Sequence, residues 1–365
     1  MSEQSPYSAG KMPWWAIREG FPPKAPKQVQ FIISDLCNQN CSFCAYRMDG
    51  YTSNELFATG ALSGYGHNNP KRFMETERAI SLLDEMKEAG VLAIQFTGGG
   101  EVTAHPDHLK IMDHAFELGF KCSLVSNGLR WSHDLIKLLA YFSWVRVSVD
   151  AGTPETYSRI RETKPENFNR VLRNVQDLAT IISEKKTDCV LGIGYVVTPE
   201  NWQEIELGVE AAKSTGAANV RLSAMFSNED EKPYITIYHG IKALIGRAMR
   251  FQDDRFKIYD LFGDRVEELR LKNPTHKLCP YMYYTSYVGA DLNPYVCCVY
   301  SYSTRGKIAN ANLKERNFGE FWNSDERKEF MEKWDSRACV RCQFTNKNSE
   351  MIELLRDDFL HKEFP

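Results

Sequence analysis

Two kinds of segment alternate along most of this chain. Short runs rich in β-branched and aromatic residues fit strands, and longer stretches with an apolar residue at every third or fourth position fit amphipathic helices. The expected strands are 29–34, 91–97, 121–128, 144–150, 189–197 and 220–226, and the expected helices between them are 75–90, 106–119, 132–142, 165–185 and 199–216. Because the strands are almost continuously apolar and helices separate them, we predict a parallel sheet covered by helices.

That alternation fits an open doubly wound sheet or a partial (β/α)6 barrel, and both folds bind ligands at the carboxyl ends of their strands. The pattern predicts an α/β domain over 28–235, preceded by an irregular, proline-rich arm over 1–27. After residue 226 the alternation stops. The expected elements of a smaller unit over 236–345 are helices near 238–251, 260–272 and 318–335 and an aromatic hairpin over 279–298 that turns at 291–294. A charged tail over 346–365 closes the chain.

One long connection interrupts the first domain. Residues 49–73 are polar and rich in glycine, with no strand or helix pattern. Connections of this length without structure of their own are often functional lids. We expect either a lid over a substrate or a disordered surface loop.

Composition narrows the class of protein. The 365 residues are 43% hydrophobic and 25% charged, with a net charge of −3, so no overall basic field favours nucleic acid as a partner. The chain starts without the basic and apolar regions of a signal peptide and has no apolar run of about 18 residues, so we expect no membrane association and a cytoplasmic location. In a reducing compartment, the ten cysteines are more readily explained as metal ligands or redox groups than as disulfides.

Three of these cysteines stand directly after the first expected strand. Cys37, Cys41 and Cys44 have the spacing C-x3-C-x2-C. Soft thiolates select iron–sulfur clusters, zinc or copper(I). A closed structural metal site needs four ligands, whereas three leave one position open for a substrate or cofactor. The alternatives are a zinc knuckle and three unrelated core thiols.

Other motifs follow the next strands at the same edge of the sheet. The glycine-rich turn Gly98–Glu101 follows the second strand, Ser126–Gly128 follows the third, and Ser148–Asp150 ends the fourth. Carboxyl ends of parallel strands meet at one edge, so these residues are expected to converge with the cysteines on a single pocket. Taken alone, the glycine-rich turn is also explained by an ordinary strand-to-helix turn.

The cysteine spacing, with Phe43 just before the last cysteine, resembles the signature loop of the radical S-adenosylmethionine (radical SAM) superfamily. The resemblance implies a partial (β/α)6 TIM-like barrel with a [4Fe-4S] cluster on Cys37, Cys41 and Cys44. It also implies that S-adenosylmethionine (SAM) chelates the open iron. In such enzymes SAM is cleaved to a 5′-deoxyadenosyl radical, which takes a hydrogen atom from the substrate. The residues that match the superfamily's SAM contacts are Phe43, Gly99, Gly100, Glu101, Ser126, Asn127, Ser148, Asp150 and Arg161.

A second set of cysteines lies in the last quarter of the chain. Cys279, Cys297, Cys339 and Cys342 supply four thiols, which close a site for either zinc or a fully ligated [4Fe-4S] cluster. The stretch GADLNPYVCC resembles the hairpin of the SPASM and twitch extensions of radical SAM enzymes, which implies a twitch-type domain with one auxiliary cluster. The turn glycine of that pattern is replaced by Asn293, which tolerates left-handed backbone. We take Cys297 rather than Cys298 as the ligand, from the C-x17-C register.

The resemblance implies an oxidoreductase that acts on a small molecule or a peptide and receives electrons from a reductant such as flavodoxin or ferredoxin. The auxiliary cluster would accept the electron that remains after hydrogen abstraction, or anchor the substrate. The alternative is a non-enzymatic iron–sulfur or zinc-stabilised sensor. The glycine-rich turn and the Ser126–Gly128 turn count against the sensor, since a sensor needs no SAM pocket.

Overall fold

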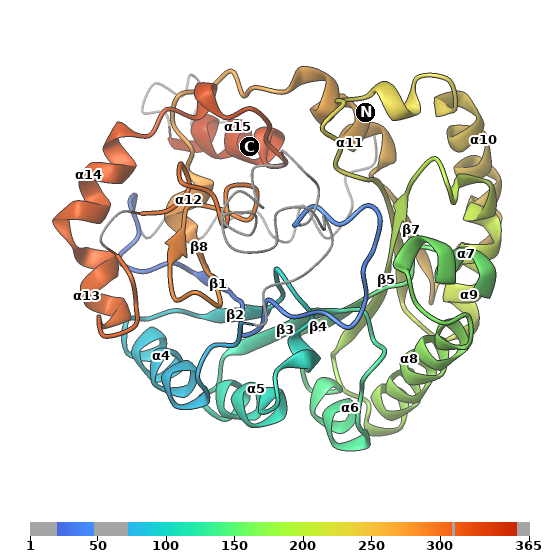
Figure 1. Ribbon diagram of the computed structural model, residues 1–365, viewed down its shortest axis with the longest axis horizontal. Coiled ribbons are helices and arrows are strands. Elements are labelled where there is room, and N and C mark those ends of the chain that lie inside the picture. Colours follow the sequence, from blue (N-terminus) through green and yellow to red (C-terminus); the bar gives the residue numbers. More distant parts are fainter. Residues whose placement is uncertain (1–19, 47–71, 309–310, 356–365) are drawn as a thin grey trace, which may run out of the picture.

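The computed structural model describes residues 20–46, 72–308 and 311–355. The expected arm before residue 20 and most of the expected lid over 49–73 lie outside these ranges. Nine strands form one curved sheet in the order β7-β6-β5-β4-β3-β2-β1-β8-β9, with helices around its outer side (Figure 1). The strands are β1 (Gln28–Phe31), β2 (Ala93–Phe96), β3 (Lys121–Ser126), β4 (Trp144–Ser148), β5 (Val190–Val197), β6 (Asn219–Ala224), β7 (Lys257–Asp260), β8 (Thr285–Val288) and β9 (Pro294–Tyr295).

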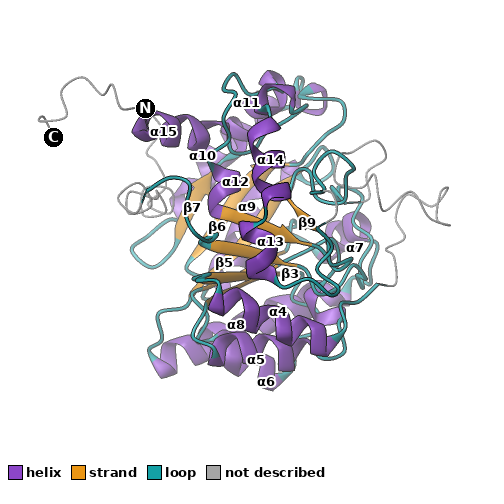
Figure 2. Cartoon of the chain, turned by 90° about the vertical axis from the view of Figure 1, so that its left-hand side faces the viewer, coloured by secondary structure: helices purple, strands orange, loops and turns teal. Residues whose placement is uncertain are grey.

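The six strands expected from the alternating pattern are β1 to β6, and each runs parallel to its neighbour. Parallel neighbours require crossover connections, which the helices supply. Five helices cover the outer side of these strands (Figures 1 and 2). They are α4 (Thr76–Glu88), α5 (His108–Glu117), α6 (His133–Leu139), α8 (Glu166–Lys185) and α9 (Ile205–Ser214). The expected α/β class and the partial TIM-like barrel are therefore confirmed.

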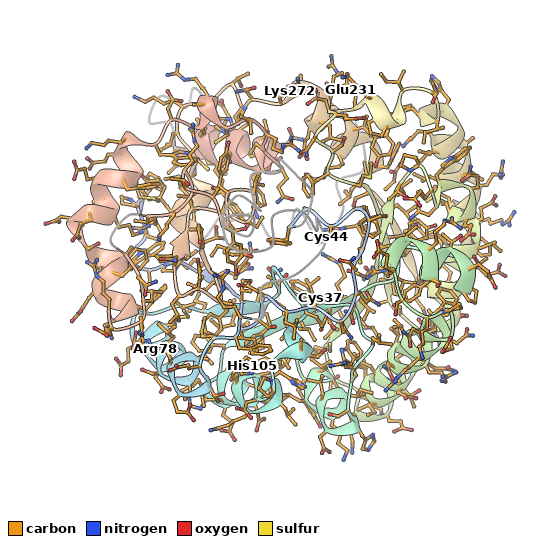
Figure 3. The ribbon with its side chains drawn as sticks, in the orientation of Figure 1. Cys37, Cys44, Arg78, His105, Glu231 and Lys272 are labelled. Atoms are coloured by element: carbon orange, nitrogen blue, oxygen red, sulfur yellow. The ribbon has the colours of Figure 1, made fainter. Side chains whose placement is uncertain are left out.

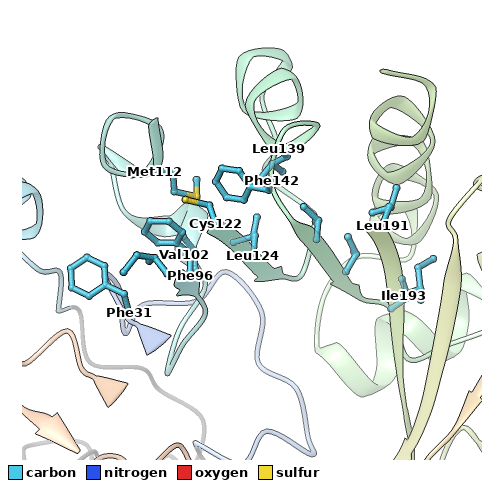
Figure 4. Packing of buried hydrophobic residues seen from close by; sticks show 14 of the residues in the cluster. Phe31, Phe96, Val102, Met112, Cys122, Leu124, Leu139, Phe142, Leu191 and Ile193 are labelled. Carbon is cyan, nitrogen blue, oxygen red and sulfur yellow. The ribbon is translucent and has the colours of Figure 1, made fainter. Parts of the chain in front are cut away.

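The hydrophobic core lies between the sheet and this helical layer. Phe31 and Phe96 sit opposite each other on β1 and β2, with ring centroids 6.3 Å apart. Met112 and Phe142 pack over them from the helical side (Figure 4). Cys122 is 1% exposed among these residues, and burial raises the pKa of its thiol to about 12. It is a small core residue rather than a ligand.

The sheet continues where the alternating pattern ends. After η4 (Lys232–Tyr234), α10 (Tyr238–Ala248) and η5 (Met249–Phe251), the unexpected strand β7 adds to β6, and α11 (Phe262–Leu271) follows it. The expected aromatic hairpin is present as β8 and β9, which pair antiparallel. Its first strand, however, pairs in parallel with β1. An open edge of β1 would present unpaired backbone groups, so the hairpin completes the barrel sheet instead of standing apart from it.

The segment after the hairpin packs on the outside of the barrel beside α4 (Figure 1). The single helix expected over 318–335 is two helices, α13 (Phe318–Asn323) and α14 (Asp325–Lys333). The break comes at Ser324, whose extended backbone ends α13 and whose hydroxyl accepts a hydrogen bond from Arg327 N at 3.3 Å to cap α14. The remaining elements are η2 (Val102–Ala104), α7 (Pro154–Arg161), η3 (Trp202–Glu204), α12 (Tyr281–Tyr284), η6 (Ser336–Ala338) and α15 (Thr345–Leu355).

Among the described residues, no helix is both long and apolar enough to cross a membrane. The helix α15 lies in the part of the chain for which we expected only a charged tail, and it buries Asn348 and Met351. Its burial ties the end of the described chain to the region around Cys279.

Arg78 of α4 is the main polar link between the barrel and the C-terminal segment (Figure 3). Its guanidinium donates to Leu313 O at 2.8 Å and Arg316 O at 2.9 Å, and it pairs with Glu85. We expect Arg78→Ala to lower the free energy of unfolding by about 1–3 kcal/mol, because two carbonyl groups and a carboxylate lose a charged donor. Chemical denaturation measures this change. The exposed pair of Lys328 with Asp325 provides the control, since Lys328→Ala should change stability by less than about 0.5 kcal/mol.

Candidate active site

The loop that carries Cys37, Cys41 and Cys44 follows β1 and crosses the carboxyl ends of the strands (Figure 3). None of the three cysteines is in a disulfide, and each is partly buried. The loop is fixed by backbone hydrogen bonds on its far side, where Asn40 N donates to Arg161 O at 3.1 Å and Ser42 N donates to Ile160 O at 3.0 Å. Its position is therefore set by the end of α7.

The near side of the loop is held by the glycine-rich turn after β2. Gly100 N donates to Ser34 O at 3.2 Å, and Glu101 N donates to Leu36 O at 2.8 Å. A Cβ atom on Gly100 would lie 2.3 Å from Leu36 O and 2.4 Å from the carbonyl carbon of Asp35. Glycine is required here because the backbone of the cysteine loop passes too close for any side chain. Gly99 beside it is buried, and its expected contact with SAM stays a prediction.

The carboxylate of Glu101 joins the turns after β2 and β3. It is 4% exposed and accepts hydrogen bonds from Thr103 N at 3.2 Å, Thr103 Oγ1 at 2.9 Å, Ser126 Oγ at 2.7 Å and Asn127 N at 2.8 Å. A buried carboxylate with four donors is well compensated. The hydrogen bonds from Ser126 and Asn127 to Glu101 therefore hold together the turns after β2 and β3, which flank the cysteine loop.

Asn127 extends this network to the first cysteine. Its amide nitrogen Nδ2 lies 2.7 Å from Asn38 Oδ1 and 3.9 Å from Cys37 Sγ, and its Oδ1 accepts from Leu129 N at 3.0 Å. The side chain therefore orients a donor toward the Cys37 sulfur. Asn38 was not among the expected site residues, although an amide between two clustered cysteines was a visible signal.

A buried ion pair holds the middle of the loop. Arg161 is 3% exposed and pairs with Asp150, two residues after the end of β4. Its Nη1 donates to Gln39 Oε1 at 2.7 Å and to Cys41 Sγ at 3.7 Å, and its Nε donates to Val149 O at 3.3 Å. The partners found for Arg161 are protein groups, so its expected pairing with the SAM carboxylate stays a prediction. Gln39, which the sequence analysis missed, connects the loop to this pair.

Asp150 has an unusual backbone conformation at the position where it pairs with Arg161. Its φ angle is +61°, a left-handed conformation that aspartate tolerates better than most residues. The Oδ1 atom accepts from Val196 N of β5 at 2.6 Å, while Oδ2 faces Arg161. Burial raises the pKa of Asp150, and the positive charge of Arg161 opposes that shift.

The remaining expected residues lie on either side of this network. Phe43 packs against the core, and the Arg161 guanidinium is 5.9 Å from its ring centroid. Ser148 is partly exposed on the inner face of β4, level with Gly194 of β5. The structure therefore brings the cysteine loop together with Phe43, Gly100, Glu101, Ser126, Asn127, Asp150 and Arg161, and leaves Ser148 on the adjoining inner face.

The donor set of this loop suits a cluster. Burial raises the pKa of the Cys41 thiol to about 12; Arg161 opposes the shift, and the nearby thiols of Cys44 and Cys37 reinforce it. Asn127 and Arg161 direct N–H groups at two of the three sulfurs. Among the described residues, no three His, Cys, Asp or Glu side chains form a group that could hold a single metal ion. Ligands of a cluster bind separate iron atoms, so they do not need that spacing.

The second set of cysteines meets in one narrow cavity. Cys279, Cys297, Cys339 and Cys342 all line it, together with aromatic residues. Burial raises the pKa of Cys279 to about 12 and that of Cys339 to about 11. Cys298 does not line this cavity; its sulfur accepts a hydrogen bond from Gln343 Nε2 at 2.8 Å.

As the side chains stand, the open space between the four thiols is about 20 Å³, the room of about one water molecule. Either a zinc ion or a cluster therefore requires the thiols to rotate, and all four already share the space into which they would turn. The stacked rings of Tyr281 and Phe344, with centroids 3.8 Å apart, form part of its wall.

We expect Gly100→Ala to lower the free energy of unfolding by about 1–3 kcal/mol, because the added methyl group pushes the cysteine loop off the turn after β2. Gly246 of α10 is the matched control, since a Cβ there meets no atom within 4 Å. Gly246→Ala should raise stability by about 0.4–1 kcal/mol. Equal effects in chemical denaturation would contradict the close backbone approach at Gly100.

Comparisons with known proteins agree with this geometry. The model of the Radical SAM superfamily matches residues 31–210. The probable GTP 3′,8-cyclase of Pyrobaculum aerophilum is 25% identical over 260 residues, which are 68% of this chain and 77% of the relative. The mycofactocin maturase MftC of Mycobacterium tuberculosis is 31% identical over 159 residues, 42% of this chain but only 35% of the relative.

A solved structure shows the same fold. The structure of Streptococcus suis SuiB bound to precursor peptide SuiA superimposes with a TM-score of 0.59, covering 89% of this chain and 71% of that one at 15% identity. The relatives named above are enzymes, and the sensor alternative has no counterpart among them. Because the family match begins at β1, includes the cysteine loop and runs through the strand ends that hold it, the chain belongs to the radical SAM superfamily of enzymes.

Proposed function

We propose that the chain binds a [4Fe-4S] cluster on Cys37, Cys41 and Cys44, and SAM beside it. The observation that carries this proposal is the network that directs Asn127 toward the Cys37 sulfur and Arg161 toward the Cys41 sulfur. When bound, the cluster supplies the electron that cleaves SAM to a 5′-deoxyadenosyl radical. The protein holds the loop rigid and offers the inner face of the sheet for the substrate. The radical would take a hydrogen atom from that substrate and become 5′-deoxyadenosine. Loss of one further electron from the substrate radical to an acceptor would make the reaction a net oxidation.

The substrate is a small molecule or a peptide. Two of the related proteins point to peptides, since one is a maturase of mycofactocin and another is solved with its precursor peptide. The cyclase relative, by its name, acts on GTP. Either kind of substrate would bind at the inner face of the strands.

We further propose that Cys279, Cys297, Cys339 and Cys342 hold an auxiliary [4Fe-4S] cluster, as in a twitch-type domain, with zinc as the alternative occupant. Support comes from the shared cavity and from the position of Cys298 outside it. A cluster there would accept an electron from the substrate radical or anchor the substrate. Four thiols saturate four iron atoms, so the anchoring role requires one thiol to leave.

Substitution of individual cysteines tests both sites. Wild-type protein reconstituted anaerobically should contain about eight irons per chain, and Cys41→Ala about four. Cys41→Ala should form no 5′-deoxyadenosine with dithionite, because the open iron is lost. Cys297→Ala should also contain about four irons but should keep dithionite-driven cleavage of SAM.

Cys298→Ala is the matched control and should retain about eight irons. Iron analysis, together with chromatography of 5′-deoxyadenosine, measures all four proteins. Cleavage of SAM by Cys41→Ala would remove the assignment of the first site. Four irons and one zinc in the wild type would make the second site structural.

The electron has to enter from a reductant, and a basic hollow lies beside the cysteine loop. The hollow has a volume of about 620 Å³ and reaches Asn38, next to Cys37. Its rim carries Arg130, Lys164 and Arg170, all exposed, and within the described residues no hydrogen bond or ion pair engages their side chains. An acidic carrier of the flavodoxin or ferredoxin type fits this charge.

Reversing the charge of this rim tests the proposed entry point. Arg130→Glu combined with Arg170→Glu should slow 5′-deoxyadenosine formation driven by reduced flavodoxin at least about tenfold at low salt, because steering by opposite charge is lost. Formation driven by dithionite should not change. The double variant Arg247→Glu and Arg250→Glu, on α10 and η5 and outside the lining of the hollow, is the control. Equal loss with both electron sources would place the effect in the active site instead.

A further inference from the structure

Two strands carry an arginine in the middle of an apolar run. Arg146 lies on β4 and Arg221 on β6. The residues on either side of each arginine are buried under the outer helices, so by the alternation of a strand both arginines stand on the inner face of the sheet. In the sequence, each arginine appears as a single charge between two apolar residues, VRV in β4 and VRL in β6. Neither triplet belongs to a known motif.

The strand between them has no side chains at the facing positions. In β5, Gly192 pairs with Arg146 and Gly194 pairs with Arg221. A Cβ on Gly194 would lie 3.5 Å from Arg146 Cδ and 3.8 Å from its Cγ. The side chain of Arg146 therefore lies across β5 toward Arg221. The amide of Asn219 covers Gly192, where a Cβ would lie 2.5 Å from Asn219 Oδ1, whereas Gly194 leaves room for Arg146 to approach Arg221.

Arg221 is partly buried and has no carboxylate partner of its own. Within the described residues it makes no hydrogen bond or ion pair, and its Nε atom is buried without a partner. Burial lowers the pKa of Arg221 well below its usual value, and Arg146 and Arg265 lower it further. The opposing carboxylate is Asp150, which already pairs with Arg161. An uncompensated buried charge is costly and is often kept for a function.

The third arginine connects this place to the second set of cysteines. Arg265 of α11 pairs with Glu268 and lies 5.0 Å from the ring centroid of Phe226. Its positive charge acts on Arg221 and also on the thiols of Cys298 and Cys342. Arg221 is itself level with Ser148, through the register of β4, β5 and β6. Arg221 on the inner face is therefore close to Arg265 of α11, whose charge also reaches the second group of cysteines.

We propose that Arg221 and Arg146 bind an oxyanion of the substrate, so that the substrate carries a phosphate or carboxylate group. The planar guanidinium fork suits bidentate contact with either group. An anion there compensates Arg221, which the fold leaves without a partner. This inference rests on the proposed function only in that the inner face is taken as the substrate site. The other available source of an oxyanion is the carboxylate of SAM.

Thermal unfolding of the anaerobically reconstituted protein tests the proposal without any catalytic readout. In wild type, about 10–20 mM inorganic phosphate should raise Tm relative to chloride of equal ionic strength, since a ligand that binds only the folded state stabilises it. Arg221→Gln should raise Tm in chloride, because it removes an uncompensated buried charge. It should also raise the apparent Kd for phosphate at least about tenfold.

Arg170→Gln, on the outer basic hollow, is the control and should keep the response to phosphate. Arg221→Lys keeps the charge and should recover part of the phosphate response but not its full strength. Succinate replaces phosphate in a second arm, and the stronger of the two responses identifies the preferred group. If Arg221→Gln fails to fold, Arg146→Gln takes its place in the same comparison.

Two results would overturn the proposal. One is an unchanged response to phosphate in the Arg221→Gln protein. The other is an equal loss of SAM binding in equilibrium dialysis, which would assign the oxyanion to the SAM carboxylate. Failure of wild type to form 5′-deoxyadenosine would instead reject the proposed function. The effect of phosphate on Tm would still test the anion site, because it does not depend on SAM cleavage.

Discussion

The ion pair between Arg161 and Asp150 is the contact on which the site depends. Asp150 follows β4 in a left-handed conformation and is fixed by Val196 N of β5. Arg161 reaches from that point to Gln39 and Cys41 in the cysteine loop. Because the pair is buried, removing one partner would leave an uncompensated charge, a loss of about 3–5 kcal/mol. The loop is thus positioned by strands of the sheet, and donors from Asn127 and Arg161 face two of its sulfurs.

A second constraint brings the C-terminal cysteines to the same structure. The hairpin strand β8 pairs with β1, the strand that leads into the cysteine loop. Behind this pairing, Tyr302 donates to Asp35 at 2.5 Å, and the hydroxyls of Tyr46 and Tyr287 lie 3.1 Å apart. Burial raises the pKa of Asp35 to about 6. These contacts join both ends of the cysteine loop to the hairpin and to the segment that follows it, so the two groups of cysteines belong to one packed unit.

Much of this arrangement could be predicted because it is local. The strands β1 to β6 follow from short apolar runs, and the motifs at their carboxyl ends follow from the chain direction of a parallel sheet. The pairing of β8 with β1 could not be predicted in this way, since the sequence of neither segment determines which strand it pairs with. Ser324 divides an apparently continuous helical pattern, because a serine caps a new helix as readily as it continues an old one.

The hydrogen-bond partners of the site residues could not be predicted from the sequence either. Glu101 and Arg161 were expected to face SAM, yet their resolved partners are turns and loops of the protein. Side-chain hydrogen bonds depend on which segments meet, and that is known only once the sheet has closed. Arg146 and Arg221 were overlooked for a related reason, since each is a single charge in a strand and gains meaning only across the glycines of β5.

The central claim is that the Cys37 loop holds a cluster with one iron open to SAM. Electron paramagnetic resonance of dithionite-reduced Cys297→Ala protein tests it most directly, because that variant should retain only the first cluster. We predict that adding SAM shifts the g values of this signal, since the amino and carboxylate groups of SAM become ligands of the open iron. A cluster signal that is identical with and without SAM would contradict the account.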